Sequence, residues 1–173
     1  MADSAAPGVP QFTRPVDIGR LPPGGAVYDL KATPAERAAL AQRFDLLALH
    51  RLEAEVRLER LAGGLLRLSA ALRADVVQAC VITLEPVHDY IDEPFTVLYR
   101  PGTAGGEVAV VLSGASEPVE PLPSDILDVG DAVAQQLSLA LDPYPRVPGA
   151  IVTAPGEARV SPFAALAKWK ENN

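Results

Sequence analysis

The sequence predicts an α+β domain in which a strongly twisted antiparallel β-sheet is packed by two main helices. Apolar and polar residues alternate over several stretches in the middle of the chain, and two other segments show helical spacing with capping residues at their starts. The chain has 173 residues, of which 49% are hydrophobic and 5% are aromatic. We therefore expect one core built mostly of leucine, valine and alanine. Whether the sheet closes toward a barrel is left open.

The N-terminal 30 residues are expected to form only short extended segments. Residues 1–11 are small and polar with two prolines, and we expect a disordered lead-in. A short strand is expected within 12–21, because two prolines and two glycines follow at 22–25. A second short strand is expected over 26–30.

The clearest helix start in the chain follows these strands. Thr33 fits the N-cap, Pro34 fits the first helical position, and Glu36 fits the returning half of a capping box. The expected helix covers residues 34–44.

Residues 50–76 have the clearest strand pattern. Leucine, alanine and valine fill the even positions of 52–58 and 66–76, and the loop 62–64 suits a tight hairpin. Opposite residues whose numbers add to 126 put unlike charges together. The predicted pairs are Glu59 with Arg67, Glu53 with Arg73, and Arg51 with Asp75.

These pairs would commit most of the hairpin arginines to strand pairing. An alternative stays open, in which an arginine stripe contacts RNA. The residues of that stripe are Arg51, Arg57, Arg67 and Arg73.

Further strands are expected after the hairpin. The second hairpin strand is expected to run on through 77–84, and Glu85 and Pro86 are expected to turn the chain. Alternation predicts another strand over 93–100 and a short one over 108–112. We expect a loop over 113–123, which is rich in proline, serine and acidic residues.

The second main helix is expected over about 126–141. Ser124 or Asp125 would cap it, and Asp128 and Asp131 in its first turns would suit the helix dipole. Prolines at 143, 145 and 148 would end regular structure. The expected organisation is a single domain over 12–145 and an irregular extension over 146–173 that contains a short helix near 163–169.

The charge is unevenly distributed along the chain. The net charge is −7, yet residues 85–145 alone contain eleven acidic residues and one basic residue, Arg100. Such a segment repels a phosphate backbone and favours a basic partner. The competing interpretation is that these acids only keep the surface soluble.

The sequence contains no recognisable catalytic or metal-binding pattern. Cys80 is the only cysteine, and His50 and His88 are isolated, so we expect no metal site and no cofactor. The acidic residues Glu85, Asp89, Asp92 and Glu93 are close together in sequence, but nothing indicates a pocket or a raised pKa. No glycine-rich phosphate loop and no run of 18 apolar residues is present. We therefore expect a non-enzymatic cytoplasmic protein without a small-molecule substrate.

Residues 79–87 read Ala-Cys-Val-Ile-Thr-Leu-Glu-Pro-Val, and an acidic helical segment and the ending Ser-Pro-Phe-Ala-Ala-Leu follow in order. This series resembles the YceD family, the large ribosomal RNA subunit accumulation proteins of bacteria and plastids. The family motif would correspond here to Cys80, Leu84, Glu85, Pro86 and the strand aromatic Phe95. The family's second motif cysteine is Thr83 in this chain, so a metal-binding role for such cysteines does not carry over.

The resemblance implies a role in 23S ribosomal RNA accumulation and large-subunit assembly, with the small basic ribosomal protein L32 as a candidate partner. Our first hypothesis is a factor that binds a basic ribosomal protein through an acidic surface. The residues of that surface would be Glu85, Asp89, Asp92, Glu93, Asp125, Asp128 and Asp131. The alternative is direct binding of 23S precursor RNA by the hairpin arginines. A metal-dependent hydrolase or nuclease using the acids of 85–93 ranks third.

Overall fold

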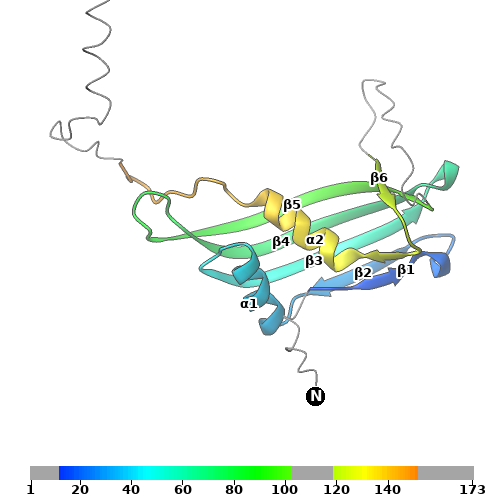
Figure 1. The fold of residues 1–173 in the computed structure, drawn as a ribbon, viewed down its shortest axis with the longest axis horizontal. Coiled ribbons are helices and arrows are strands. Elements are labelled where there is room, and N and C mark those ends of the chain that lie inside the picture. The colour runs from blue at the N-terminus through cyan, green and yellow to red at the C-terminus, as the bar shows by residue number, and fades with distance from the viewer. Residues whose placement is uncertain (1–11, 103–118, 152–173) are drawn as a thin grey trace, which may run out of the picture.

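The fold is centred on a five-stranded sheet with the strand order β2-β3-β4-β5-β6 (Figure 1). The computed structural model describes residues 12–102 and 119–151. Its strands are β2 (Ala26–Lys31), β3 (Ala48–Arg60), β4 (Leu66–Ala79), β5 (Pro86–Pro101) and β6 (Val119–Leu122). The strands β2 to β5 are antiparallel, whereas β6 runs parallel to β5. The α+β class is confirmed, and within the described residues the two edge strands are not paired, so the sheet remains open.

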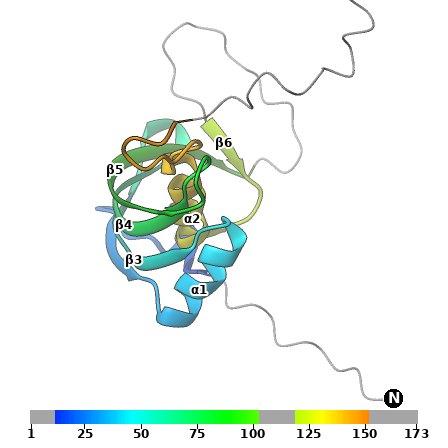
Figure 2. The same cartoon turned by 90° about the vertical axis from the view of Figure 1, so that its left-hand side faces the viewer.

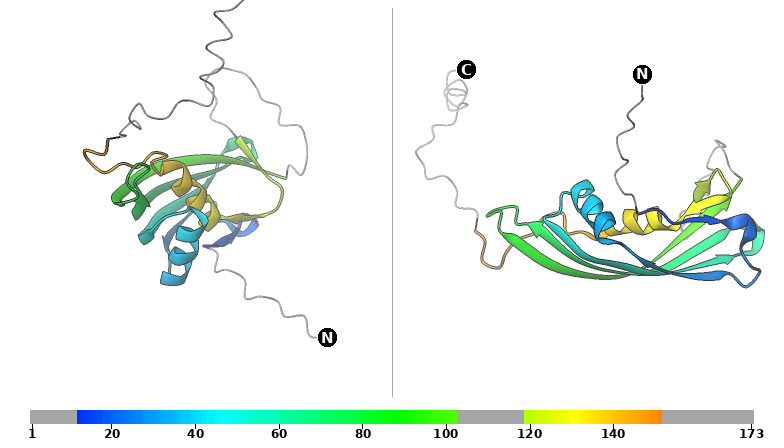
Figure 3. Two further views of the ribbon diagram at one scale, coloured as in Figure 1. Left: turned by 60° about the vertical axis from the view of Figure 1, so that its left-hand side comes forward. Right: turned by 90° about the horizontal axis from the view of Figure 1, so that it is seen from below.

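A second, two-stranded sheet and both helices lie on the concave side of this sheet (Figure 3). The small sheet pairs β1 (Pro15–Asp17) with β7 (Ile126–Asp128). The helices are α1 (Pro34–Arg43) and α2 (Val129–Ala140), and short 3₁₀ turns cover Ile18–Arg20 and Ala62–Gly64. An end view shows α2 inside the curve of the strands (Figure 2).

The predicted hairpin and its register are confirmed. From Arg51 onward every β3–β4 pair has residue numbers that add to 126, and a bulge follows Leu49. The arginines, however, form different ion pairs from those predicted. Arg51 Nη2 contacts Glu53 on its own strand at 2.7 Å, and Arg73 Nε contacts Asp92 on β5 at 3.6 Å. On a flat strand surface a long arginine reaches several acids, so register alone does not choose its partner.

The helix α1 begins as the sequence predicts. Thr33 Oγ1 accepts a hydrogen bond from the Glu36 N–H at 3.3 Å, and Glu36 Oε2 accepts one from the Thr33 N–H at 2.8 Å. Pro34 occupies the first helical position. These contacts satisfy two backbone donors that would otherwise lack partners at the start of the helix.

Two predicted boundaries around the β4–β5 turn are wrong. Strand β4 ends at Ala79 rather than at 84, and β5 begins at Pro86 rather than at 93. The reason is that Pro86 pairs with Ala79, so residues 80–85 must form the turn. Proline is tolerated at the first position of a strand because no ladder hydrogen bond is lost there.

Two elements near the second helix also differ from the prediction. Residues 119–122 form β6, where a loop was expected, and α2 begins at Val129 instead of 126. Residues 126–128 instead pair with 15–17, which leaves Asp128, rather than Ser124 or Asp125, as the N-cap. The strand expected within 12–21 is correspondingly short, only Pro15–Asp17. The lead-in 1–11, the strand 108–112 and the helix near 163–169 lie outside the described residues.

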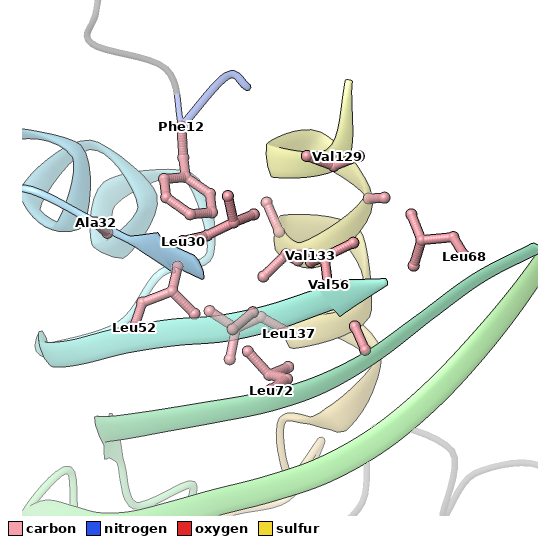
Figure 4. Close-up of a cluster of buried hydrophobic side chains, with 14 of the residues drawn as sticks. Phe12, Leu30, Ala32, Leu52, Val56, Leu68, Leu72, Val129, Val133 and Leu137 are labelled. Carbon is pink, nitrogen blue, oxygen red and sulfur yellow. The ribbon is translucent and has the colours of Figure 1, made fainter. Parts of the chain in front are cut away.

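The core lies between the sheet and α2 (Figure 4). The even-numbered residues of β3 and β4 face the helix, as the alternation predicts, and Leu68 and Leu72 are fully buried. Val133 and Leu137 of α2 are buried against this face. Burying a side chain of this size contributes about 2 kcal/mol, so this seam holds α2 over the sheet.

Candidate functional site

The turn 80–85 carries the motif residues Cys80, Leu84 and Glu85 at one end of the sheet, and Pro86 and Phe95 follow on β5. The Cys80 N–H donates to the Glu85 carbonyl at 2.8 Å, and the Leu84 N–H donates to the Cys80 carbonyl at 2.9 Å. Leu84 adopts a left-handed backbone with φ of 62°, and its side chain is 76% exposed. The chain after α2 packs on the same turn, because the Val81 N–H donates to the Pro145 carbonyl at 2.9 Å.

Cys80 is a buried anchor of this turn. Its Sγ accepts a hydrogen bond from the Thr83 N–H at 3.5 Å, and its side chain is inaccessible to solvent. The Thr83 side chain, followed by the backbone N–H groups of Thr83, Val147 and Ile82, lowers the pKa of the thiol to about 7. In the described part of the chain no three metal-ligating side chains come together. Sequence reasoning missed this hydrogen bond between Cys80 and Thr83. The family resemblance had singled out Thr83 only because it stands where the family has its second motif cysteine.

The first part of β5 and the turn residue just before it carry an exposed group of carboxylates. We name Glu85, Asp89, Asp92 and Glu93 the β5 acidic strip; all four are exposed. Alternation along the strand places Asp92 on the convex face and Asp89 and Glu93 on the concave face. No lysine or arginine occurs between Arg73 and Arg100 in the sequence. Four of the seven predicted acidic residues therefore lie in one stretch of chain at the start of β5, with Asp92 on the opposite face of the sheet from Asp89 and Glu93.

The other three predicted acids lie near the start of α2, at the far end of β5. Asp131 is close enough to Tyr99 to act on its pKa, and Tyr99 lies six residues beyond Glu93. Six residues of strand span about 20 Å. The seven carboxylates therefore do not form one continuous surface.

Two of these distant acids already have structural partners. Asp128 Oδ1 accepts from the backbone N–H groups of Arg14, Gly130 and Asp131 at 2.8, 3.0 and 3.1 Å. Asp131 pairs with Arg43 Nη1 at 3.5 Å. Asp125 is exposed, and its carbonyl accepts from the Ile18 N–H at 2.8 Å. A helix cap and an ion pair explain Asp128 and Asp131 without a binding partner.

The arginines of the alternative hypothesis lie on the convex face of the sheet. Arg57 Nε contacts Glu59 at 2.7 Å, and the pKa of Glu53 is lowered by its hydrogen bond to Arg51. Acidic residues from β2, β3 and β4 share this face, namely Asp29, Glu53, Glu55, Glu59 and Asp75. A mixed face of this kind lacks the continuous positive potential that a phosphate backbone needs.

Two of the three aromatic residues of β5, Phe95 and Tyr99, belong to the core, and the third, Tyr90, is 52% exposed. Phe95 packs partly buried against the core, and Tyr99 is buried. Burial, followed by the charges of Glu120 and Asp131, raises the pKa of Tyr99 to about 12. Neither ring is presented to solvent for stacking on a nucleic-acid base.

The burial of Tyr99 can be tested by measuring the stability of the protein at alkaline pH. Its pKa is raised above the ordinary value of 10 in the folded protein, so unfolding is increasingly favoured between pH 10 and 12. We expect the loss of stability from this residue to be on the order of 2 kcal/mol. Denaturant titrations from pH 9 to 12 would measure it, with Tyr99→Phe as the comparison. An equal decline in the variant would contradict the assignment.

Comparison with known proteins agrees with the motif at the β4–β5 turn. The family described as large ribosomal RNA subunit accumulation protein YceD matches residues 68–170, a span that contains most of β4 and all of β5, β6, β7 and α2. No curated protein and no solved structure matches the chain. Among the described residues, no helix is long and apolar enough to cross a membrane. The match covers more than half of the chain, which therefore belongs to the YceD family of large ribosomal RNA subunit accumulation proteins.

Proposed function

We propose that this protein supports large-subunit ribosomal RNA accumulation by holding a basic ribosomal protein against the β5 acidic strip, without catalysing a reaction. The family description supplies the link to large-subunit RNA. The observation that carries the partner class is the strip itself, with four exposed carboxylates and no lysine or arginine between Arg73 and Arg100. Such a surface steers a basic protein toward it and repels phosphate.

The geometry favours a protein partner over direct RNA contact. The ion pairs of Arg51, Arg57 and Arg73 with neighbouring acids reduce the positive charge that the convex face presents. The exposed acids Asp89 and Glu93 are better placed to bind a charged partner than these arginines are, because no ion pair within the described residues neutralises them. Ribosomal protein L32 is the partner we propose to test first. This role places the protein in the cytoplasm, where subunits are assembled.

Reversing two charges of the strip should weaken this binding. We expect the double variant Asp89→Lys and Glu93→Lys to bind purified L32 at least tenfold more weakly, because attraction is replaced by repulsion. Calorimetric titrations at low and high salt would measure the Kd and its salt dependence. The matched control is Asp29→Lys with Glu55→Lys, which makes the same change in net charge on the convex face.

Two outcomes would contradict the proposal. One is an equal weakening of L32 binding in the convex-face control, which would show that only the net charge of the protein matters. The other is recovery of 23S precursor RNA, but no basic protein, in a nuclease-controlled pull-down. The RNA alternative would then be examined by mobility shifts with Arg51, Arg57, Arg67 and Arg73 replaced by alanine.

A further inference from the structure

Strand β5 has a long edge along which no strand of the described residues pairs with it. On one side it pairs with β4 along residues 86–99, whereas on the other side β6 pairs only with residues 98–101 (Figure 1). Residues 86–97 therefore form a free edge within the described part of the chain. A free edge presents main-chain N–H and C=O groups that can pair with another strand.

The hydrogen bonds show which residues point their main-chain groups outward. The Tyr90 N–H donates to the Asp89 carboxylate at 2.8 Å, and the Gly102 N–H donates to the Leu122 carbonyl at 3.1 Å. The β4–β5 register has no shift, so outward groups recur at every second residue. The outward set therefore consists of the even-numbered residues, and it includes Pro86 and Pro94.

The two prolines limit the usable part of this edge. Pro94 has no N–H to offer, which leaves His88, Tyr90 and Asp92 as consecutive outward residues with both a donor and an acceptor. An added strand over 87–93 could make about six main-chain hydrogen bonds, because each outward residue forms two. One of them would replace the bond from the Tyr90 N–H to the Asp89 carboxylate. Seven residues span about 23 Å.

The carboxylates beside the free edge of β5 determine which kind of strand can pair with it. Asp92 flanks the edge on the convex face, and Asp89 and Glu93 flank it on the concave face. A second copy of β5 would bring like charges together, which disfavours self-association. An extended basic segment would instead meet Asp89 and Glu93 on the concave face, and Asp92, which Arg73 contacts at 3.6 Å, on the convex face. Charge complementarity thus points to a basic occupant.

We infer that the β5 edge binds an extended lysine- or arginine-rich segment of its partner as an additional strand, with residues 88, 90 and 92 forming the main-chain bonds. This inference rests on the proposed function and adds the mode of binding. Main-chain pairing supplies affinity in strand addition, and flanking side chains supply specificity.

Proline at an outward position should block the added strand. Tyr90→Pro removes one edge donor without removing a β4–β5 hydrogen bond, as Pro94 does naturally. The matched control is Tyr90→Thr, which loses the aromatic ring but keeps the N–H. The probe is a nine-residue peptide that alternates lysine and valine. We expect at least tenfold weaker binding to Tyr90→Pro and less than a twofold change for Tyr90→Thr.

Modified peptides test the same inference on the unaltered protein. Two peptides would be compared, one N-methylated at its odd-numbered residues and the other at its even-numbered residues. Only alternate N–H groups of an added strand face β5, so one peptide should lose binding and the other should keep it. Hydrogen exchange at Tyr90 and Asp92 should slow when the peptide binds. Equal binding of both methylated peptides, or equal Kd values for Tyr90→Pro and Tyr90→Thr, would overturn strand addition. If Asp89→Lys with Glu93→Lys still weakened L32 binding, the proposed function would stand without it.

Discussion

Gly130→Ala is expected to lower the free energy of unfolding by about 3 kcal/mol through overpacking. A Cβ at this position would lie 2.4 Å from the Phe12 carbonyl oxygen and 2.9 Å from the Arg14 nitrogen. Both are main-chain atoms, and the Val129 N–H donates to the Arg14 carbonyl at 3.1 Å, so the chain just before β1 cannot simply shift away. Urea denaturation monitored by circular dichroism would measure the change.

Whether Gly130→Ala lowers or raises the stability distinguishes the effect of packing from that of helix propensity. Alanine normally stabilises a helix by about 1 kcal/mol relative to glycine, so a variant as stable as the unaltered protein would contradict the close approach. Gly24→Ala is the matched control, because its added Cβ would meet no atom within 4 Å. We expect that variant to change stability by no more than about 0.5 kcal/mol.

Glu36→Ala is expected to lower the free energy of unfolding by about 3 kcal/mol, because it breaks an ion pair and a helix cap together. Arg14 Nη1 and Nη2 donate to the two Glu36 carboxylate oxygens at 2.8 and 3.1 Å. The same carboxylate accepts from the Thr33 N–H, and Glu36 is only 9% exposed. Calorimetric melting would measure the loss. Unchanged stability would show that the pair does not hold the N-terminal segment to α1.

The pH dependence isolates the charge of Glu36. Its hydrogen bond to Arg14 is the main cause that lowers its pKa from 4.5 to about 2. The stabilisation is therefore complete above pH 4.5 and is lost as the pH falls toward 2, with an upper limit of about 3 kcal/mol. Glu36→Gln keeps an acceptor for Thr33 but should lack this pH-dependent part. Parallel acid titrations of both proteins would contradict the assignment if their curves had the same shape.

The candidate site could be predicted from the sequence only in part. The acidic residues of 85–93 are visible as a local charge cluster, and the structure leaves them exposed, Glu85 in the turn before β5 and the other three on the strand. Asp128 has the same residue type, but it caps α2 and binds the Arg14 N–H, 114 positions away in the chain. Distinguishing a carboxylate that binds a partner from one that caps a helix requires knowledge of which N–H groups lie beside it.

The sequence by itself determined the β3–β4 hairpin, its register after Arg51, and the start of α1 at Pro34. These features depend on neighbouring residues: a period of two for the strand faces, unlike charges across the pair, and a capping box within four residues. Local patterns of this kind need no knowledge of distant contacts.

Only the tertiary structure decided where β4 ends, which segment pairs with β1, and which edge of β5 remains free. Residues 126–128 continue the apolar pattern of α2, yet they pair with residues 15–17 as β7. Likewise, β6 joins β5 in parallel over 98–101 and stops there. The physical reason is that main-chain N–H and C=O groups pair with whatever chain lies beside them, and that neighbour is chosen by burial of the whole core.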